Sequence, residues 1–183
     1  MLTNNYKKMA MYHVVGDYTS KRILTQSLVN TNGDTVTTYN PASSSYASAV
    51  ALGNYLINPR SAASIAAGYV YFGDGNTTPI ADDYTLSGNI IVGLTFETKF
   101  SATEENDGVR ISAVYKITNN NSNAITISEV GIFGYGYRYD GYPDSSLGVI
   151  MLERSLLDYP VTIEAGAFGE VTYEIKVYYP TLA

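Results

Sequence analysis

From about Tyr69 onward the chain alternates apolar and polar residues with a period of two, and this pattern constrains the fold more than any other feature. Between Val92 and Phe100, for example, Thr95, Glu97 and Lys99 face the opposite way from their apolar neighbours. The positions predicted to face a core are Val92, Leu94, Phe96 and Phe100, then Val109, Ile111, Ala113, Tyr115 and Ile117, and later Val171, Tyr173, Ile175 and Val177. Successive side chains of a β-strand point to opposite faces, so these stretches predict half-buried antiparallel strands.

Shorter β-prone runs at 125–133, 147–153 and 161–164 complete the set, and polar or glycine-bearing turns separate them. About seven short strands at this spacing predict a mainly β fold, an antiparallel β-sandwich of Ig-like or jelly-roll-like type. In the run 125–133 the residues expected to face the core are first Ile125 and Ile127 and then Val130 and Ile132, so the alternation shifts by one residue. We therefore expect a β-bulge at Ser128 and Glu129.

The chain before Gly68 has a different pattern. Leu2, Tyr6, Met9 and His13 recur at helical spacing, which predicts a short amphipathic helix that begins at a Thr3 or Asn4 cap and ends near Gly16.

Two further features lie between that helix and the sandwich. Asn32-Gly33 between β-branched residues predicts a hairpin with a type I′ turn. Residues 41–64 are rich in Ser and Ala and contain Pro59, which predicts a flexible or weakly helical connector. We therefore expect an N-terminal docking or oligomerisation segment at 1–64 and a β-sandwich domain at 65–183.

Composition excludes several classes of partner. The net charge is −6, and the doublets Lys7-Lys8 and Lys21-Arg22 are too few to predict a nucleic-acid surface. The apolar run 61–73 is shorter than the roughly 17–25 residues that cross a bilayer, so no membrane partner is expected. The chain has no cysteine, and a disulfide framework is therefore excluded.

The loop after the aromatic strand "YVYFG" raises the question of a ligand site. Asp74, Asn76 and Thr78 occupy the first, third and fifth places of a calcium loop, but Pro79 and Thr85 stand where glycine and glutamate are needed. A less regular cation site that uses Asp82 or Asp83 is the alternative. A phosphate cradle is disfavoured because no helix is expected to follow the glycines.

We therefore interpret this loop as structural. Its predicted structural residues are Gly73, Asp74, Gly75, Pro79, Asp83 and Leu86. Gly73 and Gly75 are expected to permit positive φ, Pro79 to fix the exit of the loop, and Leu86 to return to the core.

The sequence offers little for catalysis, so no catalytic residue, metal or cofactor is predicted. His13 is the only histidine, and without cysteine a histidine-based nucleophilic triad is nearly excluded. A carboxylate glycosidase that uses Asp82-Asp83 or Glu104-Glu105 is the weakest alternative.

A tyrosine-rich stretch, "FGYGYRYDGYPD", is the strongest candidate for contact with another molecule. Tyrosine and glycine loops suit protein or sugar contact, because the ring buries apolar area while the hydroxyl still bonds. The alternative is that Tyr135 and Tyr137 merely continue the preceding strand. The interface or binding candidates are Tyr135, Tyr137, Arg138, Tyr139 and Tyr142, with Tyr6, Met9 and His13 on the expected helix.

Four motifs in this order resemble those of tailed-bacteriophage virion proteins: an aromatic strand before "GDGNTTP" with an acidic residue ahead of a leucine, then "ISEVGIF", "LER" and "VTIEAG". The similarity covers roughly residues 65–179, and the opening "LTNNYKK" is also similar to the start of such proteins. Gly73, Gly75, Pro79 and Leu86 match the loop, Glu129, Gly131 and Phe133 match the second motif, and Arg154 and Gly166 match the later ones. The tyrosine-rich insertion at 135–143 departs from the pattern.

The resemblance implies a non-enzymatic structural subunit of a virion, made in the bacterial cytoplasm and attached to the tail, neck or capsid as a decoration. Its partners would be other virion proteins and sister copies in a homo-oligomer. The alternative is a receptor- or glycan-binding module of a tail or fibre that uses the loop 135–143 on a host surface.

Overall fold

The computed structural model describes residues 1–7, 26–38, 56–66, 68–137 and 146–178. Within these ranges the chain is mainly β, and a helical turn spans residues 4–7. The strands are β1 (Gln26–Val29), β2 (Thr35–Thr38), β3 (Tyr69–Gly73), β4 (Leu94–Glu105), β5 (Gly108–Asn119), β6 (Ile125–Tyr137), β7 (Ser146–Ile163) and β8 (Phe168–Tyr178).

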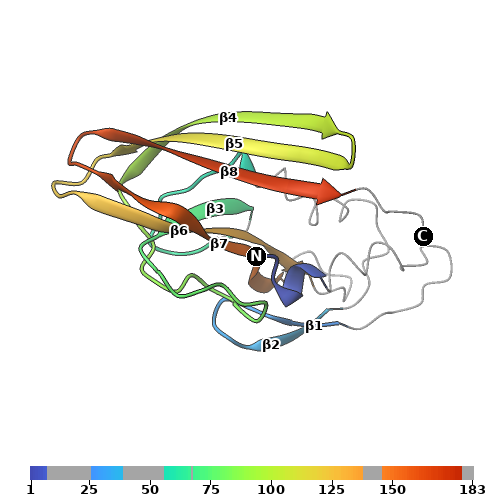
Figure 1. The fold of residues 1–183 in the computed structure, drawn as a ribbon. Helices are drawn as coiled ribbons and strands as arrows, with labels where there is room; N and C mark the ends of the chain where they lie inside the picture. The colour runs from blue at the N-terminus through green and yellow to red at the C-terminus, as the bar shows by residue number, and fades with distance from the viewer. Residues whose placement is uncertain (8–25, 39–55, 67, 138–145, 179–183) are drawn as a thin grey trace.

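Six of these strands form two antiparallel sheets, each with three strands. One sheet has the order β3-β6-β7 and the other has the order β4-β5-β8, while β1 and β2 form a separate hairpin. The two larger sheets lie one above the other in Figure 1. This arrangement is consistent with the predicted β-sandwich.

Apolar side chains from both sheets form one core. The strand β3 contributes Phe72, whose ring stacks on Phe96 of β4 at 5.5 Å and meets Tyr115 of β5 edge-on at 5.3 Å. The buried members from the two sheets are Val70, Phe72, Ile127, Val130, Ile132, Ile150, Leu152 and Ile163 on one side, and Leu94, Ala113, Tyr115, Ile117, Val171 and Tyr173 on the other. Burial of these faces supplies the main driving force for the fold.

The predicted burial is confirmed for Ala113, Tyr115 and Ile117 of β5 and for Val171 and Tyr173 of β8, but it is wrong for two residues in or just before β4. Val92 precedes the strand and is 40% exposed, and Phe100 within the strand is 45% exposed. The strand β4 is an edge strand of its sheet, and burial falls along it from Leu94 towards the β4–β5 turn. An apolar residue can therefore lie on the inward face and still contact solvent.

The predicted bulge at Ser128 and Glu129 is confirmed. Ile127 pairs with Val161 but Glu129 pairs with Leu156, so residues 157–160 of β7 lie opposite a single residue of β6. The irregularity keeps Ile127 and Val130 in the same core while it turns Glu129 to the other face of the sheet. The predicted runs 147–153 and 161–164 are parts of one long strand, β7.

The start of the chain packs on β7. Leu2 pairs with Glu153, and the amide of Thr3 donates to the Leu152 carbonyl at 3.0 Å. Thr3 caps the helical turn, since the Tyr6 amide donates to its Oγ1 at 3.3 Å, but Leu2 lies outside the helix. The predicted helix beyond Lys7, with Met9 and His13, lies outside the described residues.

The predicted hairpin is confirmed, but its turn type is wrong. The connection between β1 and β2 spans residues 30–34, and the Gly33 amide donates to the Asn30 carbonyl at 2.9 Å. The central residues of this turn are therefore Thr31 and Asn32, and Gly33 follows them with a positive φ of 85°. A longer loop of this kind needs one left-handed residue where a type I′ turn needs two.

The described part of the expected connector contacts the sandwich. Leu28 of β1 and Leu56 are fully buried in the core shared by the two sheets, and Pro59 forms a parallel bridge with Val70. Residues 41–55 lie outside the described ranges. The division of the chain at residue 64 stays a prediction.

The two phenylalanines Phe72 and Phe168 provide a test of this core. Phe72→Ala removes a ring that is 1% exposed and should lower the free energy of unfolding by about 3–5 kcal/mol. Phe168→Ala is the matched control: its ring is 68% exposed and lies over Lys116, so the loss should stay below about 1 kcal/mol. Urea denaturation measures both, and equal losses would contradict the assigned core.

Candidate functional site

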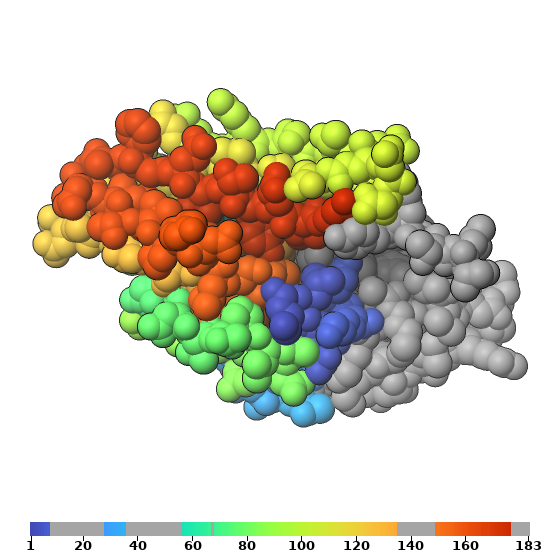
Figure 2. Space-filling model, in the orientation of Figure 1, coloured from blue at the N-terminus to red at the C-terminus, as the bar shows by residue number. Residues whose placement is uncertain are grey.

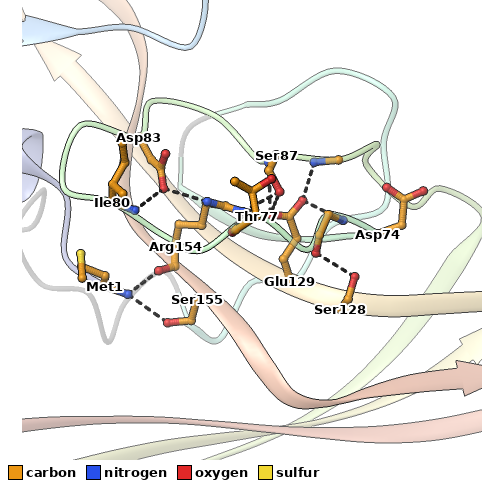
Figure 3. A network of polar contacts seen from close by, with 12 residues as sticks. Met1, Asp74, Thr77, Ile80, Asp83, Ser87, Ser128, Glu129, Arg154 and Ser155 are labelled. Atoms are coloured by element: carbon orange, nitrogen blue, oxygen red, sulfur yellow. Dashed lines mark hydrogen bonds and ion pairs between the residues drawn. The ribbon is translucent and has the colours of Figure 1, made fainter.

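Arg154 of β7 is a charged residue in the interior, with 1% of its surface exposed. Its Nε donates to Glu129 Oε2 at 2.7 Å and its Nη1 donates to Asp83 Oδ2 at 2.8 Å (Figure 3). Its Nη2 donates to the Thr77 carbonyl at 2.7 Å and to Ser87 Oγ at 2.5 Å. Charged groups are rarely buried unless they are paired and hydrogen-bonded. We name Arg154, Glu129 and Asp83 the buried ion cluster.

Glu129 of β6 is fully buried and saturated with donors. Its Oε1 accepts from the amides of Gly75 at 3.1 Å and Gly88 at 2.8 Å. Its Oε2 accepts from the amide and the hydroxyl of Ser87, each at 3.1 Å, in addition to Arg154. A carboxylate with this number of charge-assisted hydrogen bonds is held firmly in one position.

The cluster lies on the face of the β3-β6-β7 sheet that is turned away from the main core. There Leu86 packs in a second apolar cluster with Tyr71, Phe133 and Met151, and Tyr71 meets Phe133 edge-on at 5.6 Å. The prediction that Leu86 returns to the core is therefore confirmed, since it is 5% exposed. The loop 74–89 thus covers this face, with apolar contacts beside the ion cluster.

Glycine is required at two places in this loop because two backbone segments touch. A Cβ on Gly75 would lie 2.1 Å from Ser87 Oγ and 2.4 Å from the Gly88 nitrogen, and a Cβ on Gly88 would lie 2.3 Å from the Gly75 nitrogen. Positive φ is found at Gly33, Gly68, Gly93 and Gly166, so the expectation of positive φ at Gly73 and Gly75 was wrong. A Cβ on Gly73 or Gly75 would instead lie 2.7 or 2.3 Å from Glu129 Oε1, so close packing is the reason for glycine at these two positions.

The electrostatics of the cluster favour the charged carboxylate. Burial alone would raise the pKa of Glu129, but the Arg154 guanidinium and the amides of Gly88 and Ser87 outweigh burial and hold this pKa below its ordinary value. Burial would likewise lower the pKa of Arg154, yet Asp83 and Glu129 raise it. Both partners therefore stay ionised in the folded protein.

Asp74 and Asp82 are used in local contacts outside the cluster. Asp74 Oδ1 accepts from the Asn89 amide at 2.6 Å, which closes the base of the loop. Asp82 Oδ1 accepts from Asn4 Nδ2 at 2.6 Å, whereas its neighbour Asp83 contacts Arg154. Within the described ranges no three His, Asp or Glu side chains gather as metal ligands would.

Glu105, from the other carboxylate pair considered for a glycosidase, is held by two cations. Glu105 Oε1 accepts from Arg110 Nε at 2.6 Å, and Glu105 Oε2 lies 2.7 Å from Lys176 Nζ. Arg110 first, and then Lys176, lower the pKa of Glu105 to about 2. A carboxyl group with this pKa is not a general acid near neutral pH.

The tyrosine-rich candidates fall mostly outside the described residues. The backbones of Tyr135 and Tyr137 belong to β6 and pair with Val149 and Ser146, so the alternative that they continue the strand is confirmed. Tyr6 packs against the main core, and burial raises the pKa of its hydroxyl. Arg138, Tyr139, Tyr142, Met9 and His13 lie outside the described ranges, and a binding loop at 135–143 stays a prediction.

The pairing of Glu129 with Arg154 was not predicted from the residues. A signal was present, because Glu129 is the one charged residue of β6 and Arg154 is the one cationic residue of β7. The shift in periodicity indicated the bulge, but it could not show that Glu129 meets Arg154, since this pairing depends on the register of β6 on β7 and on the path of the loop.

Comparison of the chain with protein-family models, with curated proteins and with solved structures gives no match. In the part of the chain that the structure describes, no helix has the length and apolar character needed to cross a membrane.

Replacing Glu129 tests whether the buried ion cluster holds the fold together. Glu129→Gln leaves Arg154 buried with less compensating charge and should lower the free energy of unfolding by about 3–5 kcal/mol. Glu97→Gln is the control, because that side chain is 79% exposed and its pair with Lys116 is long, at 3.6 Å. Chemical denaturation measures the two losses. If Glu129→Gln lowers the free energy of unfolding no more than Glu97→Gln does, the buried ion cluster contributes nothing to stability.

The lowered pKa of Glu129 predicts a pH dependence. Its stabilising contribution is fully present above the ordinary pKa of about 4.5 and is lost as pH falls through the lower folded value. The stability gap between the native chain and Glu129→Gln should therefore be constant from pH 7 to 5 and shrink below about pH 4.5. Denaturation curves across this range measure it. A gap that widens as the pH falls would mean that the folded pKa is raised.

Proposed function

We propose that this chain is a non-enzymatic structural subunit of a bacteriophage particle, attached to the tail, neck or capsid, where it assembles or stabilises the virion. The proposal starts from the resemblance of residues 65–179 to tailed-phage virion proteins. One observation carries it: three of the four motifs behind that resemblance meet at the buried ion cluster. Gly75 comes from the loop motif, Glu129 from "ISEVGIF" and Arg154 from "LER".

The fourth motif also has a structural use in the fold. Gly166 of "VTIEAG" has a φ of 71° in the turn between β7 and β8, and the Gly166 amide donates to the Asn119 carbonyl at 2.9 Å. A turn of this kind joins the two sheets at one end. The residues that carry the resemblance are therefore those that join the loop, the strands and the turn, which supports a role as a scaffold.

The chemistry of the cluster supports a role without catalysis. Protein groups donate hydrogen bonds to both carboxylate oxygens of Glu129, and the three guanidinium nitrogens of Arg154 donate to protein acceptors. The Glu129 side chain is 0% exposed. A catalytic acid or base must reach the proton that it transfers. A charged pair enclosed in this way stabilises a loop more readily than it serves a substrate.

The proposed partners are other virion proteins and sister copies, and the proposed place is the virion, after synthesis in the bacterial cytoplasm. Nucleic acid and membrane are not among the proposed partners. The Ig-like or jelly-roll-like type of sandwich also belongs to this proposal.

Particle purification tests the proposed function. We expect the chain to co-sediment through a density gradient with phage particles from the source that carries its gene, at a fixed ratio to the major capsid protein and after a high-salt wash. Quantitative mass spectrometry of the gradient fractions measures this ratio, with an abundant host cytosolic protein as the control. A chain made during infection that stays with the control protein would contradict the proposal.

A further inference from the structure

The strand β4 is one of the two edge strands of the β4-β5-β8 sheet, and its 12 residues make it a long one. It runs along the upper margin of the molecule in Figures 1 and 2. Exposed edge strands present unpaired N–H and C=O groups that can pair with another strand. Among the described residues, β4 pairs only with β5.

The register shows which backbone groups of β4 point to this open side. The Asn120 amide donates to the Gly93 carbonyl at 2.9 Å, while the Leu94 amide points the other way and donates to Ser61 Oγ at 2.9 Å. Backbone groups of an antiparallel strand alternate between its two neighbours. The N–H and C=O groups of Phe96, Thr98 and Phe100 therefore point away from β5.

The charges on β4 single out one register for a second strand. In an antiparallel pair of two identical strands, a two-fold axis through Thr98 places Glu97 opposite the second copy's Lys99, and this contact occurs twice. An axis through Glu97 or Lys99 would instead place like charges opposite each other, which is destabilising. Lys99 has no ion-pair partner within the described ranges, and Glu97 has only its long contact with Lys116.

The apolar residues of β4 fit the same register. An axis through Thr98 places Phe96 opposite the second copy's Phe100. Phe100 is 45% exposed although it lies on the inward face, and Phe96 already stacks on Phe72 in the core. Aromatic cross-strand pairs stabilise a sheet, so pairing would cover a ring that one copy leaves in water.

We propose that β4 is the self-association edge of this protein, where two copies pair antiparallel around Thr98 to form one continuous six-stranded sheet, β8-β5-β4-β4-β5-β8. The outward groups of Phe96, Thr98 and Phe100 form the new backbone hydrogen bonds, and Glu97 and Lys99 select the register. This inference rests on the sister-copy part of the proposed function. It names the surface, which lies in the sandwich and not in the segment 1–64.

Charge reversal tests the register in solution. Size-exclusion chromatography with light scattering should give the mass of two chains for the native protein. Lys99→Glu sets like charges opposite each other twice, so the dissociation constant of the dimer should rise about tenfold or more. The double variant Glu97→Lys with Lys99→Glu restores the opposite charges and the native net charge, and it should recover the dimer. Circular dichroism confirms that each variant is folded.

A cysteine scan tests the axis independently, because the chain contains no cysteine. Thr98→Cys should form a covalent dimer under mild oxidation, since directly opposed residues lie about 5.5 Å apart, within disulfide reach. Thr103→Cys on the same strand is the matched control, because the two copies of residue 103 would lie about 34 Å apart at 3.4 Å per residue.

Three results would overturn this inference: a native protein that is monomeric at all concentrations, a dimer unaffected by Lys99→Glu, or equal cross-linking at positions 98 and 103. A chain that fails these tests yet co-sediments with phage particles leaves the proposed function standing. If the protein dimerises through β4 but is absent from phage particles, the proposed function is contradicted and the proposed self-association edge still stands.

Discussion

The loop over the β3-β6-β7 sheet depends on one buried ionic contact, between Arg154 of β7 and Glu129 of β6. Two ionised groups in an interior cost free energy unless their remaining donors and acceptors are bonded, and here the amides of Gly75, Ser87 and Gly88 supply those bonds. The pair therefore fixes the loop 74–89 over the sheet, and the loop in turn covers Leu86 and its apolar neighbours. Removing either charge would leave the other buried with less compensating charge.

Much of the fold could be predicted from the sequence because burial has a simple periodic signal in strands. Ala113, Tyr115 and Ile117 are buried as the alternation requires, and the shift between Ile127 and Val130 indicated the bulge. Phe100 shows the limit of the same signal. Alternation predicts the face of the sheet on which a side chain lies. Only the order of the strands shows that β4 is an edge strand, whose inward side chains are less buried.

The candidate site was less accessible to sequence reasoning, because it is made by contacts between distant residues. The glycines of the loop were expected to provide positive φ, but Gly75 and Gly88 are needed because their backbones touch. Asp82 and Asp83 are adjacent in sequence, yet one contacts Asn4 and the other contacts Arg154. Local sequence does not specify such pairings. The register of β6 on β7 and the path of the loop decide them.

Hydrogen–deuterium exchange of the amides of Gly75, Ser87 and Gly88 is the most direct measurement of the central claim, that the buried carboxylate holds this loop as part of the rigid scaffold. The account predicts that these three amides exchange as slowly as those of the paired strands β6 and β7, since each donates to Glu129. Exchange at the rate of an unprotected surface loop, in the native protein near neutral pH, would contradict it.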